Sequence, residues 1–434
     1  MITKQNLYIS LILLANMTLI SCKKNNNIQT MPEFAEQSSV LIAWNKNPFA
    51  TKSNDYSNDA VSVQIVKNLI TQGKIIIQCY DENVKNRAIQ SLELEGINTK
   101  QIDFWIYPSD LLFPRDYAAD IVQNEKEEKS LSGFDFDFYG TYPKGYEIEP
   151  IYKDFSKLHA SRLGIAKNSF STIVSEGGDR EFNGEGVMMA IEETEVTKRN
   201  PGKTKIQVEA EFKRQFGVKK IIWLPQATYD DEHMYSGKIP DENGNFIAFR
   251  SASANGHIDE MCRFVDANTI LIAYINEKEA KKSILAKLNK ERLDKAYEVL
   301  KNAKDINGKP FRIIKMPVPE PIYINLKSGD PIFEDYISIA ELYNHKLLDG
   351  TPFPKNEMKT LPALSYCNFL IFNDVVLSQQ YYQEGMSIEI KRKDQMAKEI
   401  LEKVFPTRKI IPISTIALNL YGGGIHCNTK NINK

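Results

Sequence analysis

The stretch Val61-Ser-Val-Gln-Ile-Val-Lys-Asn-Leu-Ile-Thr-Gln-Gly-Lys-Ile-Ile-Ile-Gln-Cys79 contains the pattern that decides the fold. Its apolar residues up to Ile70 recur at spacings of three and four, which predicts an amphipathic helix. Gly73 ends this pattern, and the isoleucine-rich run Lys74–Cys79 that follows predicts a buried strand. The stretch is therefore expected to be a helix that leads, after a short break, into a strand.

The same order of helix and strand recurs four more times along the chain. The further copies run from Phe155 to Val174, from Ile206 to Leu224, from Leu285 to Met316 and from Met396 to Ile413. Other strand-like runs lie between the copies, at Val40–Trp44, Val187–Ile191, Thr269–Ile275 and Phe369–Ser378. Helices that alternate with strands throughout indicate an α/β protein. Because no single unit can bury its own apolar face, the five units predict one pseudo-symmetric domain.

Two polar segments that contain Gly and Pro interrupt this repetition, at Asp230–Ala254 and Ser328–Pro362. We predict them as long loops, which in compact domains are often lids or binding loops. No low-complexity linker divides the chain between residues 31 and 434. The sequence therefore predicts a single catalytic domain over residues 31–434.

The first residues have the pattern of an export signal. Met1–Lys4 carries positive charge, and the apolar run that follows is shorter than the roughly 20 residues of a membrane-spanning helix. Leu19-Ile-Ser-Cys22 resembles a bacterial lipobox, in which the cysteine is lipidated. We expect residues 1–21 to be a signal peptide, Cys22 to carry a lipid anchor and residues 22–30 to be a tether. The alternative is an ordinary signal with an incidental cysteine.

Composition restricts the class of partner. The chain has 55 Lys and Arg against 56 Asp and Glu, so its formal net charge is −1 and it has no basic footprint for a nucleic acid. Cys79 and Cys367 lie in or beside apolar runs, where a free cysteine behaves as a small buried hydrophobe. We therefore expect no disulfide, although an exported protein meets an oxidising environment.

Cys427 lies in a different setting, in Gly422-Gly-Gly-Ile-His-Cys-Asn-Thr429. Successive glycines let the backbone approach a ligand closely, and a cysteine on such a loop is a candidate nucleophile. A glycine-rich turn with a chance cysteine is an equally good interpretation of this motif alone. His257, in Asn255-Gly-His-Ile-Asp259, is a candidate proton-transfer partner, although a structural His–Asp pair is common. If this segment is extended, His257 and Asp259 point to the same face.

Two further motifs place carboxylates near turns: Pro114-Arg-Asp-Tyr117 and Ser175-Glu-Gly-Gly-Asp179. Acidic residues are usually solvated at the surface, so neither motif is specific alone. A planar guanidinium, however, is matched by carboxylates that accept its fixed fork of donors. Several acids around one cysteine would suit a cationic guanidino substrate. The chain has no His-Glu-x-x-His and no Cys-x-x-Cys, so we predict no metal site.

Together these motifs resemble the agmatine deiminase and bacterial-type peptidylarginine deiminase family of guanidino-modifying enzymes. The matching stretches follow one another in order over most of the chain. They are Met31-Pro-Glu-Phe34, Val40–Trp44, Arg115-Asp116, Glu176-Gly-Gly178, Asn183-Gly-Glu-Gly186, Lys198-Arg-Asn-Pro-Gly202, Ile222-Trp-Leu-Pro225, Gly256-His-Ile-Asp259, Arg263-Phe-Val265, Ser365-Tyr-Cys-Asn368 and Gly422–Thr429. The resemblance implies the pentein fold, a five-bladed α/β propeller with pseudo-fivefold symmetry.

The resemblance also implies roles for individual residues. Cys427 would be the nucleophile and His257 the general acid and base, while Asp116 and Asp259 would grip the guanidinium. Glu176 would orient His257 or contact the substrate. Asn368 would line the pocket. The reaction would release ammonia and pass through a covalent thiouronium on Cys427, with no cofactor.

The resemblance leaves the substrate open between agmatine and peptidyl arginine. The peptidylarginine branch uses arginines after a strand to hold a substrate carboxylate. The corresponding stretch, Gly133-Phe-Asp-Phe-Asp-Phe-Tyr-Gly-Thr-Tyr142, has no arginine and contains Asp135 and Asp137, which would repel a carboxylate and suit a free amine. The predicted export instead favours peptidyl arginine over agmatine, because agmatine deiminases are typically cytoplasmic.

Two other classes of function stay open at this point. One is a guanidino-binding lipoprotein without turnover, which would need neither Cys427 nor His257. The other is a cysteine peptidase, which would leave the ring of carboxylates unexplained because a peptide carbonyl carries no positive charge. We expect a small guanidino compound or an arginine-containing peptide as partner, no nucleic acid, and attachment to a bacterial membrane, at the periplasmic or cell-surface side, through the lipid. The oligomeric state is not predicted.

Overall fold

The computed structural model describes residues 28–48, 56–142 and 150–434. The predicted signal peptide, Cys22 and the first part of the tether lie outside these residues. Ile28–Thr30, which we expected to be tether, instead forms strand β1, paired antiparallel with β5 (Asp120–Asn124). The tether prediction is therefore wrong for these three residues, because their backbone is hydrogen-bonded into a sheet.

Five of the sheets in the described part contain a unit of three strands that pair in the same pattern. In each, the first strand is antiparallel to the second, the second is parallel to the third, and a helix connects the second to the third, as a parallel pair requires. The four units in the middle of the chain are β5, β6 (Lys129–Asp135), α5 (Pro150–Leu163) and β7 (Asn168–Val174); β8 (Glu181–Phe182), β9 (Val187–Ile191), α6 (Lys205–Phe216) and β10 (Lys220–Leu224); β13 (Cys262–Asp266), β14 (Thr269–Tyr274), α8 (Ile284–Asn302) and β15 (Arg312–Pro317); and β18 (Leu370–Phe372), β19 (Val375–Gln380), α10 (Ile388–Val404) and β20 (Lys409–Ser414).

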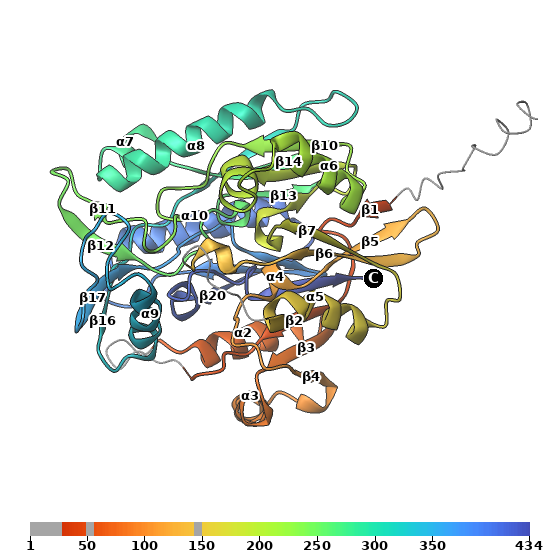
Figure 1. Cartoon of the computed structure of the whole chain (residues 1–434), viewed down its shortest axis with the longest axis horizontal. Helices are drawn as coiled ribbons and strands as arrows, with labels where there is room; N and C mark the ends of the chain where they lie inside the picture. Colours follow the sequence, from red (N-terminus) through yellow and green to blue (C-terminus); the bar gives the residue numbers. More distant parts are fainter. Residues whose placement is uncertain (1–27, 49–55, 143–149) are drawn as a thin grey trace, which may run out of the picture.

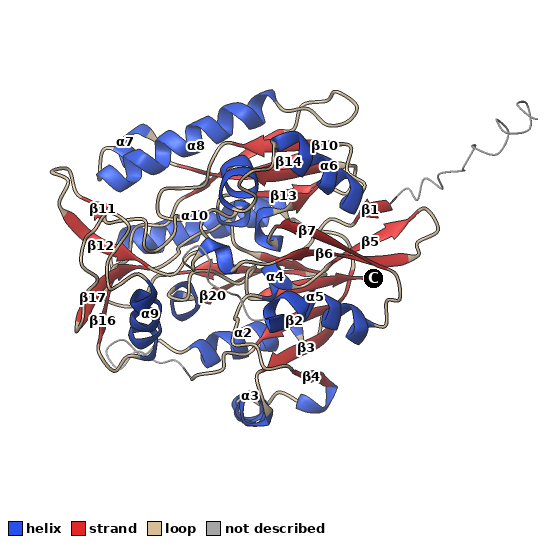
Figure 2. Cartoon of the chain, viewed as in Figure 1, coloured by secondary structure: helices blue, strands red, loops and turns tan. Residues whose placement is uncertain are grey.

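The fifth unit joins the two ends of the described chain. Its first strand is β21 (Thr429–Asn433), which pairs with β2 (Gln37–Ala43). Helix α2 (Asn58–Leu69) and strand β3 (Lys74–Cys79) complete it, and α3 (Glu82–Leu94) leads to an additional strand, β4 (Ile102–Ile106). Figure 2 shows α8 and α3 at opposite outer edges with strands between them. The five predicted helix-to-strand units are confirmed, while their arrangement as propeller blades stays a prediction.

The run Phe369–Ser378, predicted as one strand, is instead a hairpin of β18 and β19. Asn373 has a φ of 50°, and asparagine tolerates this left-handed conformation better than most residues. The prediction missed the turn because apolar residues flank it on both sides.

The two segments predicted as long loops contain regular structure, so that prediction is wrong. Their elements are β11 (Ile239–Pro240), β12 (Phe246–Arg250), α9 (Pro331–Leu342) and β17 (Glu357–Leu361). With β16 (Ile324–Lys327), the strands form a separate sheet in the order β11-β12-β17-β16. The two segments lie side by side at the left of Figure 1, although residues 255–327 separate them in sequence. Each strand is short, and the two segments are joined only by the pairing of β12 with β17, so neither segment alone has a strong pattern.

The second strand is almost entirely buried in four of the units (β2, β9, β14 and β19), which explains the continuous apolar runs in the sequence. In three of the units a short polar turn directly precedes the first strand. The one-turn helix α4 (Pro114–Tyr117) packs against the turn η3 (Gly177–Asp179), which in turn packs against the turn η5 (Ile258–Glu260). Polar residues from separate units therefore meet in one place. Among the described helices, none is long and apolar enough to span a membrane.

Candidate active site

Cys427 lies in a tight turn between helix α11 (Ile416–Asn419) and strand β21. The glycines before it are needed for close packing. Gly422 has a φ of 99°, and a Cβ there would lie 2.0 Å from the carbonyl oxygen of Ala252. A Cβ on Gly423 would lie 3.0 Å from the Cys427 sulfur itself. Larger residues at either position would therefore displace the cysteine.

The Cys427 sulfur is buried among polar groups from other parts of the chain. The side-chain amide of Asn368 donates to Sγ at 3.1 Å, and the thiol donates to Asp259 Oδ2 at 3.7 Å and Glu260 Oε1 at 3.8 Å. Burial, with the negative charges of Asp259, Glu260 and Asp116, raises the pKa of the Cys427 thiol well above its usual range. A cation bound beside the sulfur would offset these charges and favour the reactive thiolate.

His257 lies directly before η5, with its buried ring between two carboxylates. Nδ1 is 3.6 Å from Asp116 Oδ1, and Nε2 is 3.6 Å from Glu176 Oε2. Burial lowers the pKa of His257, but the charges of these carboxylates outweigh it and raise the pKa to about 9. His257 is therefore protonated at neutral pH, as a proton donor must be. Neither ring nitrogen makes a hydrogen bond to another residue that the structure describes.

Asp116 and Glu176 are held by different partners. Asp116 accepts hydrogen bonds from the Gly178 amide and from the Tyr139 hydroxyl, both at 2.9 Å. Glu176 accepts from Arg199 Nε at 2.8 and 2.9 Å. Burial raises the pKa of Glu176, but Arg199 and His257 outweigh it and lower the pKa to about 2. Glu176 is therefore ionised, and it supports the positive charge on His257.

Asp259 lies in η5, so the extended geometry that would have paired it with His257 is not present. Its Oδ2 is instead 2.6 Å from Nδ1 of His426. Burial raises the pKa of Asp259, but His426 and His257 outweigh it and lower the pKa below its usual value. Its Oδ1 is buried and has no hydrogen-bond partner in the described part of the chain. This atom is therefore available to accept a hydrogen bond from a bound ligand.

A cavity of about 220 Å³ opens onto these groups. Cys427, Asp116 and Tyr139 line it, and α9 contributes Ile332, Asp335, Tyr336 and Ile339. The segment that we had predicted as a loop thus forms one wall of the cavity. Asp110 also lines it, and no Lys, Arg or His does so among the described residues. The cavity therefore combines apolar and aromatic walls with carboxylates, which suits an organic cation.

The predicted catalytic side chains of Cys427, His257, Asp116, Asp259 and Glu176 all lie in this region. The three predicted substrate contacts do not line the cavity. Asn368 contacts the sulfur and Glu260 instead. Asp137 caps a turn at Gly140 and lies 3.8 Å from Arg199, while Asp135 continues strand β6. Asp110 and Asp335 line the cavity and Asp135 and Asp137 do not, so contact of Asp135 and Asp137 with the far end of the substrate stays a prediction.

Sequence reasoning also missed several residues near the reacting groups: Glu33, Tyr139, Arg199, Glu260 and His426. Arg199 and Glu33 lie within motifs that carried the family resemblance, which was a usable signal. Glu260 directly follows Asp259. Tyr139 had no signal, because its place beside Asp116 depends on a turn in which Phe138 and Tyr139 both have positive φ.

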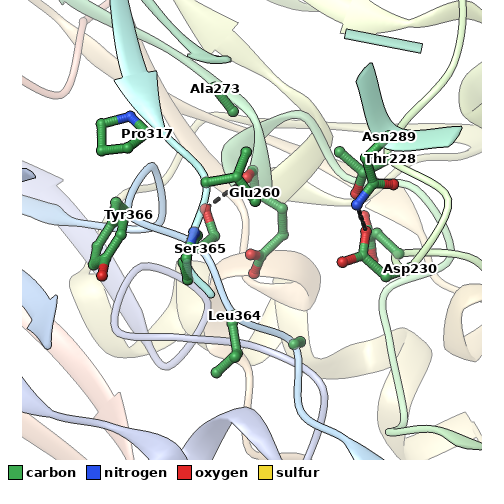
Figure 3. Close-up of a pocket in the computed structure, with 13 residues that line it drawn as sticks. Thr228, Asp230, Glu260, Ala273, Asn289, Pro317, Leu364, Ser365 and Tyr366 are labelled. Carbon is green, nitrogen blue, oxygen red and sulfur yellow. Dashed lines mark hydrogen bonds between the residues drawn. The ribbon is translucent and has the colours of Figure 1, made fainter. Parts of the chain in front are cut away.

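Glu260 also lines a second, smaller cavity, shown in Figure 3 with Ser365, Tyr366, Asp230 and Asn289. Burial, with the charges of Asp259 and other nearby acids, raises the pKa of Glu260 well above its usual value. Asp259, Glu260 and Cys427 place possible ligand atoms within 4.8 Å of one another, the one such group among the described residues. The same atoms surround the candidate nucleophile, so we assign no metal to them.

Comparisons with known proteins agree with this geometry. The family described as "Porphyromonas-type peptidyl-arginine deiminase" matches residues 29–241 and 245–432. The agmatine deiminase of Medicago truncatula is 30% identical over 420 residues, which cover 92% of this chain and 94% of the relative.

Solved structures show the same fold at lower identity. The agmatine deiminase of Enterococcus faecalis superposes with a TM-score of 0.71 at 19% identity, covering 95% of this chain and 97% of that one. A cysteine-to-serine variant of the C. jejuni agmatine deiminase with substrate bound gives 0.66 at 20% identity, covering 94% and 96%. The chain thus has the α/β pentein fold of these enzymes, and by the extent of the family match it belongs to the Porphyromonas-type peptidyl-arginine deiminase family.

Proposed function

We infer that this chain is a hydrolase that deiminates a guanidino group, a C–N bond hydrolysis on a linear amidine. The observation that carries this function is the set of buried groups around the Cys427 sulfur. Asp116 and Cys427 line the cavity, and the protonated ring of His257 lies 3.6 Å from Asp116. Asp259 places Oδ2 3.7 Å from the sulfur, and its buried Oδ1 has no partner among the described residues. A buried carboxylate oxygen without a hydrogen-bond donor is costly, and the N–H groups of a bound guanidinium would donate to Asp259 Oδ1.

The reaction follows from these positions. The bound cation lowers the pKa of the Cys427 thiol, which releases its proton to water, and the thiolate adds to the guanidinium carbon to form the S–C bond. His257 gives its proton to the departing nitrogen, and the C–N bond breaks with release of ammonia. His257 then takes a proton from water as the oxygen bonds to the same carbon. The C–S bond then breaks as the hydroxyl proton passes to the departing sulfur, which leaves a ureido product and the Cys427 thiol.

The cavity favours agmatine over peptidyl arginine. Agmatine carries a second cation at its far end, whereas arginine in a peptide carries none there and free arginine also has a carboxylate. Asp110 and Asp335 both line the cavity, and burial together with the charge of Asp110 raises the pKa of Asp335. An amine placed near these carboxylates would relieve their repulsion. The apolar side chains of α9 would contact the methylene chain between the two charged ends.

A colour assay for ureido products on agmatine, butylguanidine, free arginine and an arginine peptide tests this function. We expect agmatine to have the highest kcat/KM. Asp335→Asn should raise the KM for agmatine several-fold, up to about tenfold, and leave that for butylguanidine unchanged, because only agmatine has the distal amine. A preference for the peptide would overturn the substrate assignment. No ureido product from any compound would favour a binding protein, and casein cleavage lost in Cys427→Ser would favour a peptidase.

We also propose that the chain is exported and that a lipid on Cys22 anchors it to a bacterial membrane. The support is the charged start, the short apolar run and the lipobox-like Leu19-Ile-Ser-Cys22. Metabolic labelling with a radioactive fatty acid should label the native chain and not Cys22→Ser. Equal labelling of both proteins would exclude Cys22 as the acceptor.

A further inference from the structure

His426 precedes the nucleophile in sequence, and the mechanism above does not use it. Its ring is buried, with 1% of the residue exposed, and each nitrogen faces a carboxylate. Nδ1 is 2.6 Å from Asp259 Oδ2, and Nε2 is 2.5 Å from Glu33 Oε2. The same Asp259 oxygen lies 3.7 Å from the Cys427 sulfur. His426 therefore connects a residue near the start of the fold to the reacting centre.

The two short contacts of the His426 ring restrict where protons can lie on His426, Asp259 and Glu33. A neutral imidazole can donate from only one nitrogen, whereas an imidazolium donates from both. Two carboxylate oxygens at 2.5 and 2.6 Å both require a donated hydrogen. Either His426 is an imidazolium or one of the acids is protonated. Other contacts of Glu33 favour the first possibility.

Glu33 is surrounded by positive groups. Its Oε2 accepts from Arg263 Nη2 at 2.9 Å and lies 3.6 Å from Arg115 Nη2, while its Oε1 accepts from the amide of Ile371 at 2.8 Å. Burial raises the pKa of Glu33, but His426, Arg263 and Arg115 outweigh it, so the pKa lies well below its usual value. Glu181 on β8 also faces this group and pairs with Arg263 at 2.6 Å. Glu33 is therefore ionised.

We propose that His426 is a positioning residue, an imidazolium held by Glu33, which fixes the Oδ2 atom of Asp259 beside the sulfur and leaves Oδ1 turned toward the guanidinium. This inference rests on the deiminase chemistry and not on which guanidino compound is the substrate. Because Glu33 lies between β1 and β2, the N-terminal segment of the fold completes the active site. Glu33 binds strand β18 through Ile371 and strand β13 through Arg263, so its position depends on the assembly of several units.

The test compares Glu33→Gln and His426→Gln with the wild type. Glu33→Gln keeps the shape of the side chain and removes the charge that holds the His426 ring. We expect kcat to fall about 10- to 100-fold, as for other residues that orient a reacting group, and the pH profile of kcat to shift, because Asp259 beside the thiol is held differently. His426→Gln should lower kcat at least as much, since it removes the charge that orients Asp259.

Glu36→Gln provides the matched control, because Glu36 is in the same segment but is exposed and pairs only with Lys434 among the ion pairs described. It should match the wild type in kcat, KM and melting temperature. The rate of Cys427 alkylation by iodoacetamide against pH, followed by peptide mass, gives a readout that needs no turnover. The pH profile of the alkylation rate should be shifted in Glu33→Gln relative to the profile in Glu36→Gln.

Wild-type pH profiles for both kcat and alkylation in Glu33→Gln would overturn the proposal. A loss of kcat that follows a lower melting temperature, with no shift in either profile, would also overturn it, because a merely structural contact would have that effect. If the wild type itself forms no ureido product, the proposed function fails, and the alkylation profiles still decide the role of His426.

Discussion

Replacing Glu176 by glutamine removes one of the two carboxylates that flank His257 while keeping the side chain's shape. The two carboxylates lie at the same distance, 3.6 Å, from the two ring nitrogens. The pKa of His257 rises from 6.5 to about 9, although burial acts in the opposite direction. The carboxylates together therefore contribute more than the net rise. Loss of one of them should lower the pKa by at least ~1 unit, or about 1.4 kcal/mol.

The assay is the initial rate of ureido product formation at saturating substrate between pH 6 and 10. His257 must be protonated to release ammonia, so the alkaline limb of kcat reports its pKa in the complex. In Glu176→Gln this limb should move at least one unit toward lower pH. Glu192→Gln is the matched control, because Glu192 is half exposed and pairs with Lys205 away from the site.

A second measurement separates this electrostatic effect from misfolding. Glu176→Gln leaves Arg199 without its closest carboxylate, although Asp137 at 3.8 Å and the carbonyl of Ala254 at 2.7 Å remain. Some loss of melting temperature is therefore expected, because a buried cation has lost its partner. If kcat falls but its alkaline limb stays at the wild-type pH, Glu176 does not act through the charge of His257, and the reasoning is refuted.

Three further predictions follow from the same structure. Cys427→Ser should lower kcat on the order of 10⁵-fold or more while calorimetry still detects substrate binding, and retained turnover would exclude Cys427 as the nucleophile. The pKa of Asp120 is lowered from 3.8 to about 2, with burial outweighed by Lys430 and Arg180, so its stabilising effect is present above about pH 3.8 and lost as the pH falls toward 2. Thermal melts of Asp120→Asn should therefore show a lower melting temperature than the wild type at pH 6, and a smaller difference near pH 2. Phe212→Ala should cost about 3–5 kcal/mol in denaturant unfolding, since Phe212 is fully buried, and a change below about 1 kcal/mol would contradict its place in the core.

The sequence by itself determined the repeating units and most of the reacting groups. Helical spacing followed by an apolar run is a local pattern, because a helix or a strand has its own period whatever it packs against. The stretch from Val61 to Cys79 could therefore be interpreted without its neighbours. Cys427, His257 and Asp116 were found because reactive residue types stood in distinctive motifs. The same reasoning could not find the sheet made by β12 and β17, whose strands are short and pair across a long separation.

Only the tertiary structure decided which charges face one another. Glu33 and His426 are 393 residues apart, yet their contact determines how Asp259 is held, and no local pattern contains that information. Likewise, Asp135 and Asp137 had the charge expected for the far end of an amine substrate, but Asp110 and Asp335 line the cavity. Electrostatic effects depend on distance and burial, and both are properties of the packed chain. The residue types could thus be identified from the sequence, while their protonation states and their partners required the fold.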